Sequence, residues 1–291
     1  MPRAERLSAP LLPPVVPVLL HGYSREAPFA PPAVCVPLYG VIARHRGEER
    51  YLDAAAVATA FHFQCATPLI LTGTAEDSPL ERWWSLGPDR LNAIRRLRDI
   101  GVELVTTPNF SLFPDKPRWD DMHSMKRIAL THEEFLREGL PAALHVNART
   151  ERDWSRWTEY IYQRSEVTHV AFDFNTRAGW AGRIDWQVAQ ITALAQGVGR
   201  PLHLVVRAAG HNILARLVGA FSGTTVLDTT SFMKAVKRQR AVEATNGKIG
   251  WETCRTAPDG PVDELLAHNW SLVKRSHELV SGAAQGRRAA E

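Results

Sequence analysis

Asp173 is the residue whose type and position in this sequence best suit it to chemistry. It ends the segment HVAFD, in which an apolar Val-Ala-Phe run leads directly to a carboxyl group. A carboxylate at the end of a buried strand can act as a nucleophile or as a general base. Two structural roles are also open, because Asp173 can cap the following helix or pair with Arg177. Asp228 in VLDTTSF is a second candidate catalytic carboxylate, and for this residue capping of the next helix is the favoured interpretation.

Other polar side chains also follow short apolar segments, and we expect them to contact a substrate. They are Asn109, Asn147, Arg149, Asn175, Arg177, Arg207 and His211. Guanidinium groups bind phosphate and carboxylate groups through paired hydrogen bonds, so the three arginines predict an anion site, with structural ion pairs as the alternative. His145 falls inside its apolar segment and is interpreted as a packed core histidine rather than a metal ligand.

Residues 107–127 combine aromatic, proline and charged residues in the manner of a loop that covers a site. Trp119 offers a face on which a base can stack, and a purely structural role in a hydrophobic cluster is equally open. Asp120, Asp121 and His123 match a metal cluster only loosely, so we predict no bound metal and no cofactor. The sequence has no GxGxxG, Walker A, HExxH or GxSxG pattern, which argues against the corresponding nucleotide, zinc-protease and serine-hydrolase chemistries.

These side chains can meet only if parallel strands carry them. Short apolar or β-branched segments recur along the chain, each followed by polar residues and then by a helix-like segment, which is the pattern of βα units. The segments begin near residues 68, 102, 142, 169, 202 and 224. They predict an α/β fold, a (β/α)8-type barrel, with its site at the carboxyl ends of the strands.

The amino-terminal part of this barrel is predicted to be irregular. VPVLLHG from Val16 and VCVPLYG from Val34 can supply two further strands, but the proline-rich connection between them leaves no room for a helix. We therefore expect either a hairpin or an incomplete part of the barrel. Residues 1–14 are assigned to a flexible arm, 15–260 to the barrel domain, and 261–291 to a C-terminal helix with a frayed tail.

The composition is that of an ordinary globular protein. The chain has 291 residues, of which 45% are hydrophobic and 23% charged, and its formal net charge is +4. Its 3 cysteines are not in CxxC spacing, which is typical of a cytoplasmic protein, and no apolar run is long enough to cross a membrane. A basic helix is expected over residues 231–243, where Lys234, Lys237, Arg238 and Arg240 are candidates for nucleic-acid binding.

Two resemblances bear on function. The stretch from Thr107 to Arg149, with N-F-S-L-F, a proline, a lysine-arginine helix and H-V-N-A-R, resembles a family of uncharacterised proteins of phages and mobile elements with the pattern P-D-F-S-L…P…R…P-N-x-R. Asn109 stands at the aspartate of that pattern. More remotely, V-A-F-D-F-N-T-R and L-D-T-T-S-F-M-K-A resemble the tRNA-guanine and DNA-guanine transglycosylase superfamily, whose cysteine-rich zinc site and Gly-Gly-aromatic-Gln signature this chain lacks.

The second resemblance implies a base-exchange enzyme that acts on DNA or tRNA. It implies that Asp173 attacks the sugar C1′ and that Asp228 supports it, while the arginines and the basic helix hold the phosphate backbone around a flipped base. One alternative is a barrel enzyme that acts on a small phosphorylated or carboxylated metabolite with Asp173 as general base. Another is a non-catalytic nucleic-acid-binding protein. A second copy of the chain can close a gap at the first two strands, so a homodimer is one possible assembly.

Overall fold

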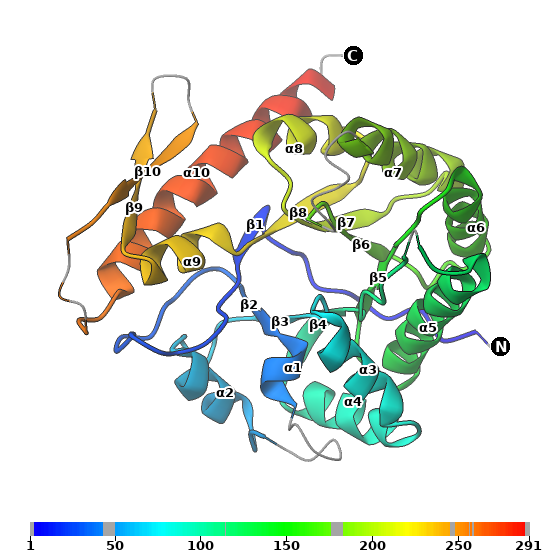
Figure 1. Ribbon diagram of the computed structural model, residues 1–291, viewed down its shortest axis with the longest axis horizontal. Coiled ribbons are helices and arrows are strands. Elements are labelled where there is room, and N and C mark those ends of the chain that lie inside the picture. Colours follow the sequence, from blue (N-terminus) through cyan, green and yellow to red (C-terminus); the bar gives the residue numbers. More distant parts are fainter. Residues whose placement is uncertain are drawn as a thin grey trace.

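An eight-stranded parallel sheet forms the centre of the molecule and curls into a nearly closed barrel (Figure 1). The computed structural model describes residues 3–42, 50–113, 115–175, 183–244, 248–255, 257 and 259–288. The strands of the barrel are β1 (Val15–Pro17), β2 (Val34–Pro37), β3 (Leu69–Thr72), β4 (Val102–Thr106), β5 (Ala142–His145), β6 (His169–Asp173), β7 (His203–Arg207) and β8 (Gly223–Asp228). The strand order β1-β8-β7-β6-β5-β4-β3-β2 confirms the predicted (β/α)8-like fold.

Both faces of the sheet are buried, which explains why its strands are nearly continuous apolar runs. Alternate side chains point into the barrel or toward the helices. The interior cluster contains Cys35, Ile70, Leu104, Ala143, Ala171, Val205 and Leu227. Their strand neighbours, among them Val36, Leu71, Val105, Leu144, Val170 and Leu204, belong to the larger core that the helices share.

β1 and β2 form the seam of the barrel. β1 pairs in parallel with β8, and β2 pairs in parallel with β3. Beyond the end of β1, Val18 forms an isolated parallel bridge with Cys35, and the N–H of Leu19 donates to the Cys35 carbonyl at 2.8 Å. The hairpin interpretation of these segments is therefore wrong, and the irregular barrel is confirmed.

Helices cover the outside of the barrel. They are α1 (Leu38–Val41), α2 (Ala54–Phe61), α3 (Asp77–Ser85), α4 (Asp89–Asp99), α5 (Arg118–Arg137), α6 (Glu151–Tyr162), α7 (Ile184–Val198), α8 (His211–Leu217), α9 (Thr230–Val236) and α10 (Asp263–Arg288). Figure 1 shows α3 to α8 following one another around the sheet. The connection from β1 to β2, residues 18–33, contains no helix, and α10 contacts β1 with Leu266 and Trp270 buried in the core. None of the described helices is both long and apolar enough to span a membrane.

The basic helix expected over residues 231–243 is wrong. α9 ends at Val236, and Arg238 adopts a left-handed conformation with a φ of 54°, which turns the chain away from the helical path. β9 (Gln239–Glu243) and β10 (Ile249–Thr253) then pair in an antiparallel manner and pack on α10. Figure 1 shows this pair projecting beside α10.

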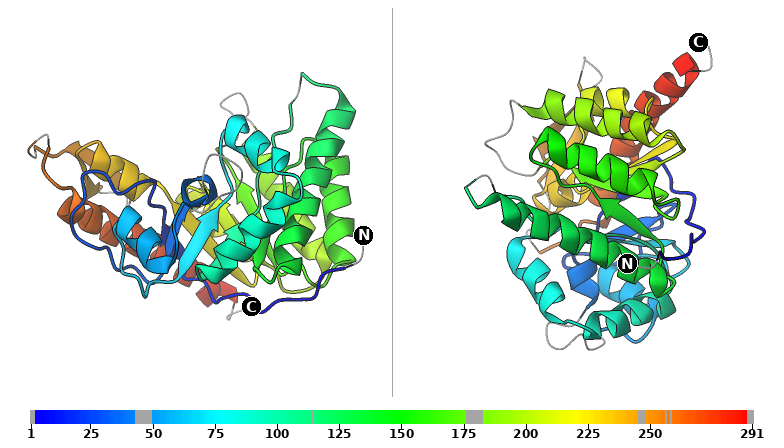
Figure 2. Two further views of the ribbon diagram at one scale, coloured as in Figure 1. Left: turned by 90° about the horizontal axis from the view of Figure 1, so that it is seen from below. Right: turned by 90° about the vertical axis from the view of Figure 1, so that its right-hand side faces the viewer.

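The amino-terminal segment, residues 3–14, lies against the end of the barrel where the strands begin. Ala9 and Leu12 pack on the interior cluster. The Pro13 carbonyl accepts a hydrogen bond from Thr225 Oγ1 at 2.9 Å, and the Pro14 carbonyl accepts one from the N–H of Val226 at 2.8 Å. Figure 2 (left) shows the segment running along the lower edge of the molecule.

Candidate active site

A cavity of about 790 Å³ opens at the carboxyl ends of the barrel strands. This central cavity is of the size that usually holds a small ligand or part of a larger one. Its lining includes Asn109, Asn147, Arg149, Asp173, Asn175 and Arg207, which come from the ends of β4, β5, β6 and β7. The structure therefore brings together six of the residues that the strand-end pattern selected. Arg177 lies outside the described residues.

Asp173 is the central carboxylate of this cavity. It is 4% exposed, and its Oδ2 lies 3.3 Å from Nη1 of Arg207 on the neighbouring strand β7. Its Oδ1 accepts a hydrogen bond from the backbone N–H of Asn175 at 2.8 Å. Because β6 and β7 place Asp173 and Arg207 directly opposite each other, the register of the sheet fixes this ion pair. Arg207 and the N–H of Asn175 thus orient the carboxylate, which faces the cavity.

The titratable side chains of His145 and Cys35 lie inside the barrel, and the positive charge of Arg207 affects the pKa of each. Burial, with a smaller contribution from Arg207, lowers the pKa of His145 to about 3, so its imidazole is neutral. Burial raises the pKa of the Cys35 thiol to about 12, so a thiolate nucleophile is not available there. As expected from the sequence, His145 is a buried residue of the barrel interior, at 2% exposure.

Asn109 and Asn147 hold the loops of the site in place. The Asn109 side-chain oxygen accepts a hydrogen bond from the N–H of Ala75, which joins the loops after β3 and β4. The Asn147 amide donates to the carbonyls of Asn109 and Phe110, at 3.2 and 2.9 Å. Both amides are therefore structural parts of the cavity wall.

The arginines of the site are paired with carboxylates. Arg149 Nε lies 3.2 Å from Oδ2 of Asp121, which is 1% exposed, and Arg149 Nη1 donates to the Phe113 carbonyl at 2.5 Å. Arg118 Nη1 also lies 2.7 Å from this Asp121 oxygen. Together with the pair of Arg207 and Asp173, this arrangement gives both arginines of the cavity lining a carboxylate partner.

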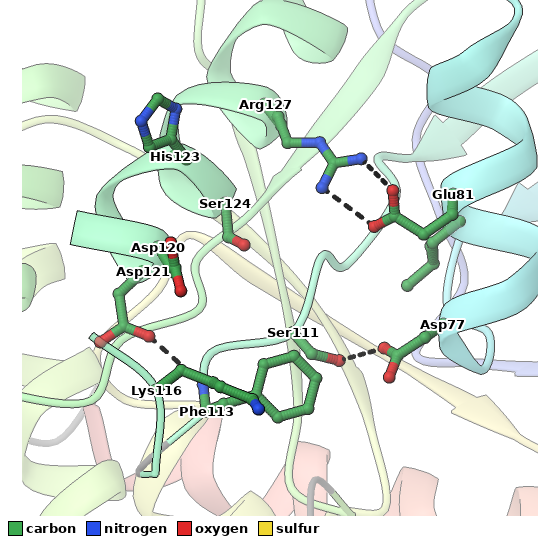
Figure 3. A pocket seen from close by; sticks show the side chains of 11 residues that line it. Asp77, Glu81, Ser111, Phe113, Lys116, Asp120, Asp121, His123, Ser124 and Arg127 are labelled. Carbon is green, nitrogen blue, oxygen red and sulfur yellow. Dashed lines mark hydrogen bonds and ion pairs between the residues drawn. The ribbon is translucent and has the colours of Figure 1, made fainter. Parts of the chain in front are cut away.

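A neighbouring cavity of about 440 Å³ lies between α3 and α5 and shares Asp77 and Ser111 with the central cavity. Figure 3 shows Arg127 of α5 reaching across to Glu81 of α3, and Ser111 beside Asp77. The Ser111 hydroxyl donates to Asp77 at 2.7 Å. Asp120, Asp121 and His123 also line this cavity. Nowhere in the described part of the chain do three or more His, Cys, Asp or Glu side chains form a group that could hold a metal ion.

Trp119, the candidate stacking residue, lies at the start of α5 and is 64% exposed. Its ring packs against that of His123, with centroids 5.3 Å apart. It does not belong to the described lining of the central cavity.

A third cavity, of about 480 Å³, lies beyond the ends of β7 and β8 and contains two other predicted residues, Asp228 and His211. Asp228 accepts hydrogen bonds from the backbone N–H groups of Thr230 and Ser231 at the start of α9, as expected for a helix cap. His211 Nε2 lies 3.0 Å from Ser276 Oγ. This cavity shares only Asn175 with the described lining of the central cavity, so neither Asp228 nor His211 joins Asp173.

The predicted nucleic-acid-binding residues surround the end of α9 rather than the central cavity. Lys234 Nζ donates to Gln239 and lies 5.3 Å from the centroid of the Trp251 ring. Arg238 donates to the Gly260 carbonyl at 2.6 Å. Lys237 and Arg240 are exposed. Because α9 is short and β9 turns away from it, these side chains do not form the single helical stripe that the sequence predicted.

Several polar residues of the central cavity were not selected from the sequence, among them Glu76, Asp77 and Gln187. Glu76 and Asp77 lie at the start of α3, and Gln187 lies in the first turn of α7. Each follows its strand by several residues, so attention to the strand ends alone misses it. Acidic residues are common in the first turn of a helix, so the sequence indicates that Glu76 and Asp77 lie at the start of α3. Nothing in the sequence distinguishes Gln187 from an ordinary helical glutamine.

Comparison of the sequence with models of protein families and with curated proteins finds no match. What the site can do chemically therefore follows from its own groups. It places one oriented carboxylate, two guanidinium groups and several amide and carboxylate side chains around a cavity with apolar walls from Leu20, Leu112 and Phe172.

Proposed function

We propose that this protein is an enzyme whose reaction is centred on Asp173, and that base exchange on a nucleic acid is the reaction its site supports best. The observation that carries the proposal is the Asp173 carboxylate, which is buried at the central cavity and oriented by Arg207 and by the N–H of Asn175. A nucleophile needs this kind of fixed geometry, because a reacting atom must be held close to its target and in line with it.

Base exchange would proceed in two balanced steps at this carboxylate. An Asp173 oxygen forms a bond to the sugar C1′ as the bond from C1′ to the base nitrogen breaks, and the base leaves with the bonding electron pair and takes up a proton from water. A second base gives the proton of its reacting ring nitrogen to water and forms its bond to C1′, and the electron pair of the ester bond returns to Asp173. Arg207 stabilises the carboxylate that re-forms in the second step. The apolar walls and amide groups of the cavity suit a planar base with a polar edge.

One observation favours a second candidate, an enzyme that acts on a small metabolite with Asp173 as general base. Lys234, Lys237, Arg238 and Arg240 do not contribute to the described lining of the central cavity. A small substrate would make no use of them.

The deciding experiment measures binding and base exchange separately. Binding to duplex DNA, single-stranded DNA and tRNA is measured across a salt series, since phosphate contacts make affinity fall steeply with salt. Exchange is followed as incorporation of a labelled base. We expect Asp173→Asn to retain binding and to lower the rate of exchange by about 10²-fold or more.

The matched control is Asp185→Asn, because Asp185 is an exposed carboxylate on α7 that does not line the cavity in the described structure. Full exchange activity in Asp173→Asn would refute the role of this carboxylate. Absence of binding to every nucleic acid, combined with turnover of a small substrate that requires Asp173, would establish the second candidate instead.

A further inference from the structure

Gln187 is a largely buried polar residue whose side chain faces the central cavity and has no hydrogen-bonding partner among the residues that the structure describes. It lies in the first turn of α7, is 6% exposed and lines the cavity. No hydrogen bond joins its carboxamide to any residue that the structure describes. The amides of Asn109 and Asn147, in contrast, are bonded to backbone groups of the cavity wall.

Gln187 is a polar residue on the face of α7 that is otherwise buried and apolar. The other buried positions of α7 are apolar, and they include Val188, Ile191 and Leu194, which pack in the core as expected for a helix that covers a sheet. Its carboxamide opens into the central cavity, where water or a ligand can supply its hydrogen bonds. A ligand that supplies both a donor and an acceptor gains specificity from this group.

We infer that Gln187 reads the polar edge of a planar heterocycle bound in the central cavity, by accepting one hydrogen bond and donating another. This inference rests on the proposed function, because it takes the ligand to be a base. A carboxamide presents a donor and an acceptor side by side, and it pairs with a ring edge that carries an acceptor beside an N–H donor. Phe172, Leu20 and Leu112 line the same cavity and suit the apolar faces of the ring.

The test compares nucleosides that differ in this edge. Guanosine, inosine and adenosine carry an N–H donor beside an acceptor on the base, whereas purine riboside has acceptors alone. Affinities are measured by calorimetry for the wild type and for Gln187→Leu, with circular dichroism to establish that the variant folds. We expect at least one of the three nucleosides to bind the wild type about tenfold more tightly than purine riboside does. Gln187→Leu should reduce this ratio to about 1.

Two variants separate recognition from a structural effect. Gln190→Leu changes a glutamine of the same helix that lines a groove between α6 and α7, and it should keep the ratio of the wild type. Gln187→Glu has acceptors alone at neutral pH, so it should retain the bond to the donor of the base and lose the bond to the acceptor. A general loss of packing would weaken all nucleosides equally and would not change the ratio.

The outcomes distinguish this inference from the proposed function. If Gln187→Leu keeps the ratio of the wild type, or if no nucleoside binds the wild type more tightly than purine riboside, the inference is wrong, even where Asp173-dependent exchange is observed. If the ratio depends on Gln187 but no exchange occurs with any nucleic acid, the binding site stands and the proposed reaction fails.

Discussion

Replacement of His145 by leucine should make the protein more resistant to acid. His145 is 2% exposed in the barrel interior, and neither of its ring nitrogens has a hydrogen-bonding partner among the described residues. Burial, with a smaller contribution from Arg207, lowers its pKa from 6.5 to about 3. Leucine fills a similar volume, and the change removes no hydrogen bond of the imidazole.

The magnitude follows from proton binding by the unfolded chain. Because the pKa is lower in the folded state, the unfolded state binds more protons below pH 6.5, and stability falls as the pH falls from 6.5 toward 3. A pH of 5 is 1.5 units below the pKa of 6.5 of the histidine in the unfolded chain. Protonation of this side chain in the unfolded state then favours unfolding by about 2 kcal/mol. His145→Leu removes this term, so it should be about 2 kcal/mol less sensitive to a change from pH 7.5 to pH 5.

The assay is urea unfolding followed by circular dichroism at several pH values between 5 and 7.5, for the wild type and the variant. At pH 7.5 we expect the variant to be at least as stable as the wild type, since it no longer buries an unpartnered polar ring. His123→Leu, at an exposed position of α5, is the control for a histidine-to-leucine change outside the barrel interior. Parallel curves of stability against pH for the wild type and His145→Leu would refute the reasoning, because they would mean that the imidazole is charged in the folded protein.

Two other substitutions test the parts of the fold that position the site. Asp228→Ala removes the acceptor for the N–H groups of Thr230 and Ser231 and should lower the free energy of unfolding by about 1–2 kcal/mol, whereas Asp228→Asn should retain most of it, as measured by urea unfolding. Ala171→Leu adds volume to the barrel interior beside His145 on β5, so it should cost about 1–3 kcal/mol of stability. The measurement for Ala171→Leu is thermal unfolding. An unchanged midpoint would show that the barrel interior around Ala171 can accommodate the larger side chain, and would contradict this prediction.

The barrel could be predicted from the sequence because the relevant signals are local. Each later strand is a short apolar run, and the first polar residue after it, such as Asp173, is carried to the common edge of the sheet. Interactions between distant segments have no such signal. Arg149, which follows β5, pairs with Asp121 of the preceding helix α5, and the spacing of the two residues in the sequence does not indicate this ion pair.

The error at residues 231–243 has the same physical origin. Helix α9 stops because Arg238 adopts a positive φ of 54°. A glycine at this position would have indicated such a conformation in the sequence, but an arginine does not. Continuation of the chain as β9 then depends on pairing with β10 and on packing against α10, both later in the sequence. The composition of the segment alone favours a helix.

The pairing of the arginines also bears on which ligands suit the site. The described lining of the central cavity includes the carboxylates of Glu76, Asp77 and Asp173 and the guanidiniums of Arg149 and Arg207. Since Arg149 is paired with the buried Asp121 and Arg207 with Asp173, each guanidinium of the lining already has a carboxylate partner, and the start of α3 adds negative charge. A phosphate that displaced Asp121 or Asp173 from its guanidinium would leave a buried carboxylate without its partner. The reacting part of a substrate is therefore better matched as a neutral ring and sugar than as an anion, and phosphate groups would lie outside this cavity.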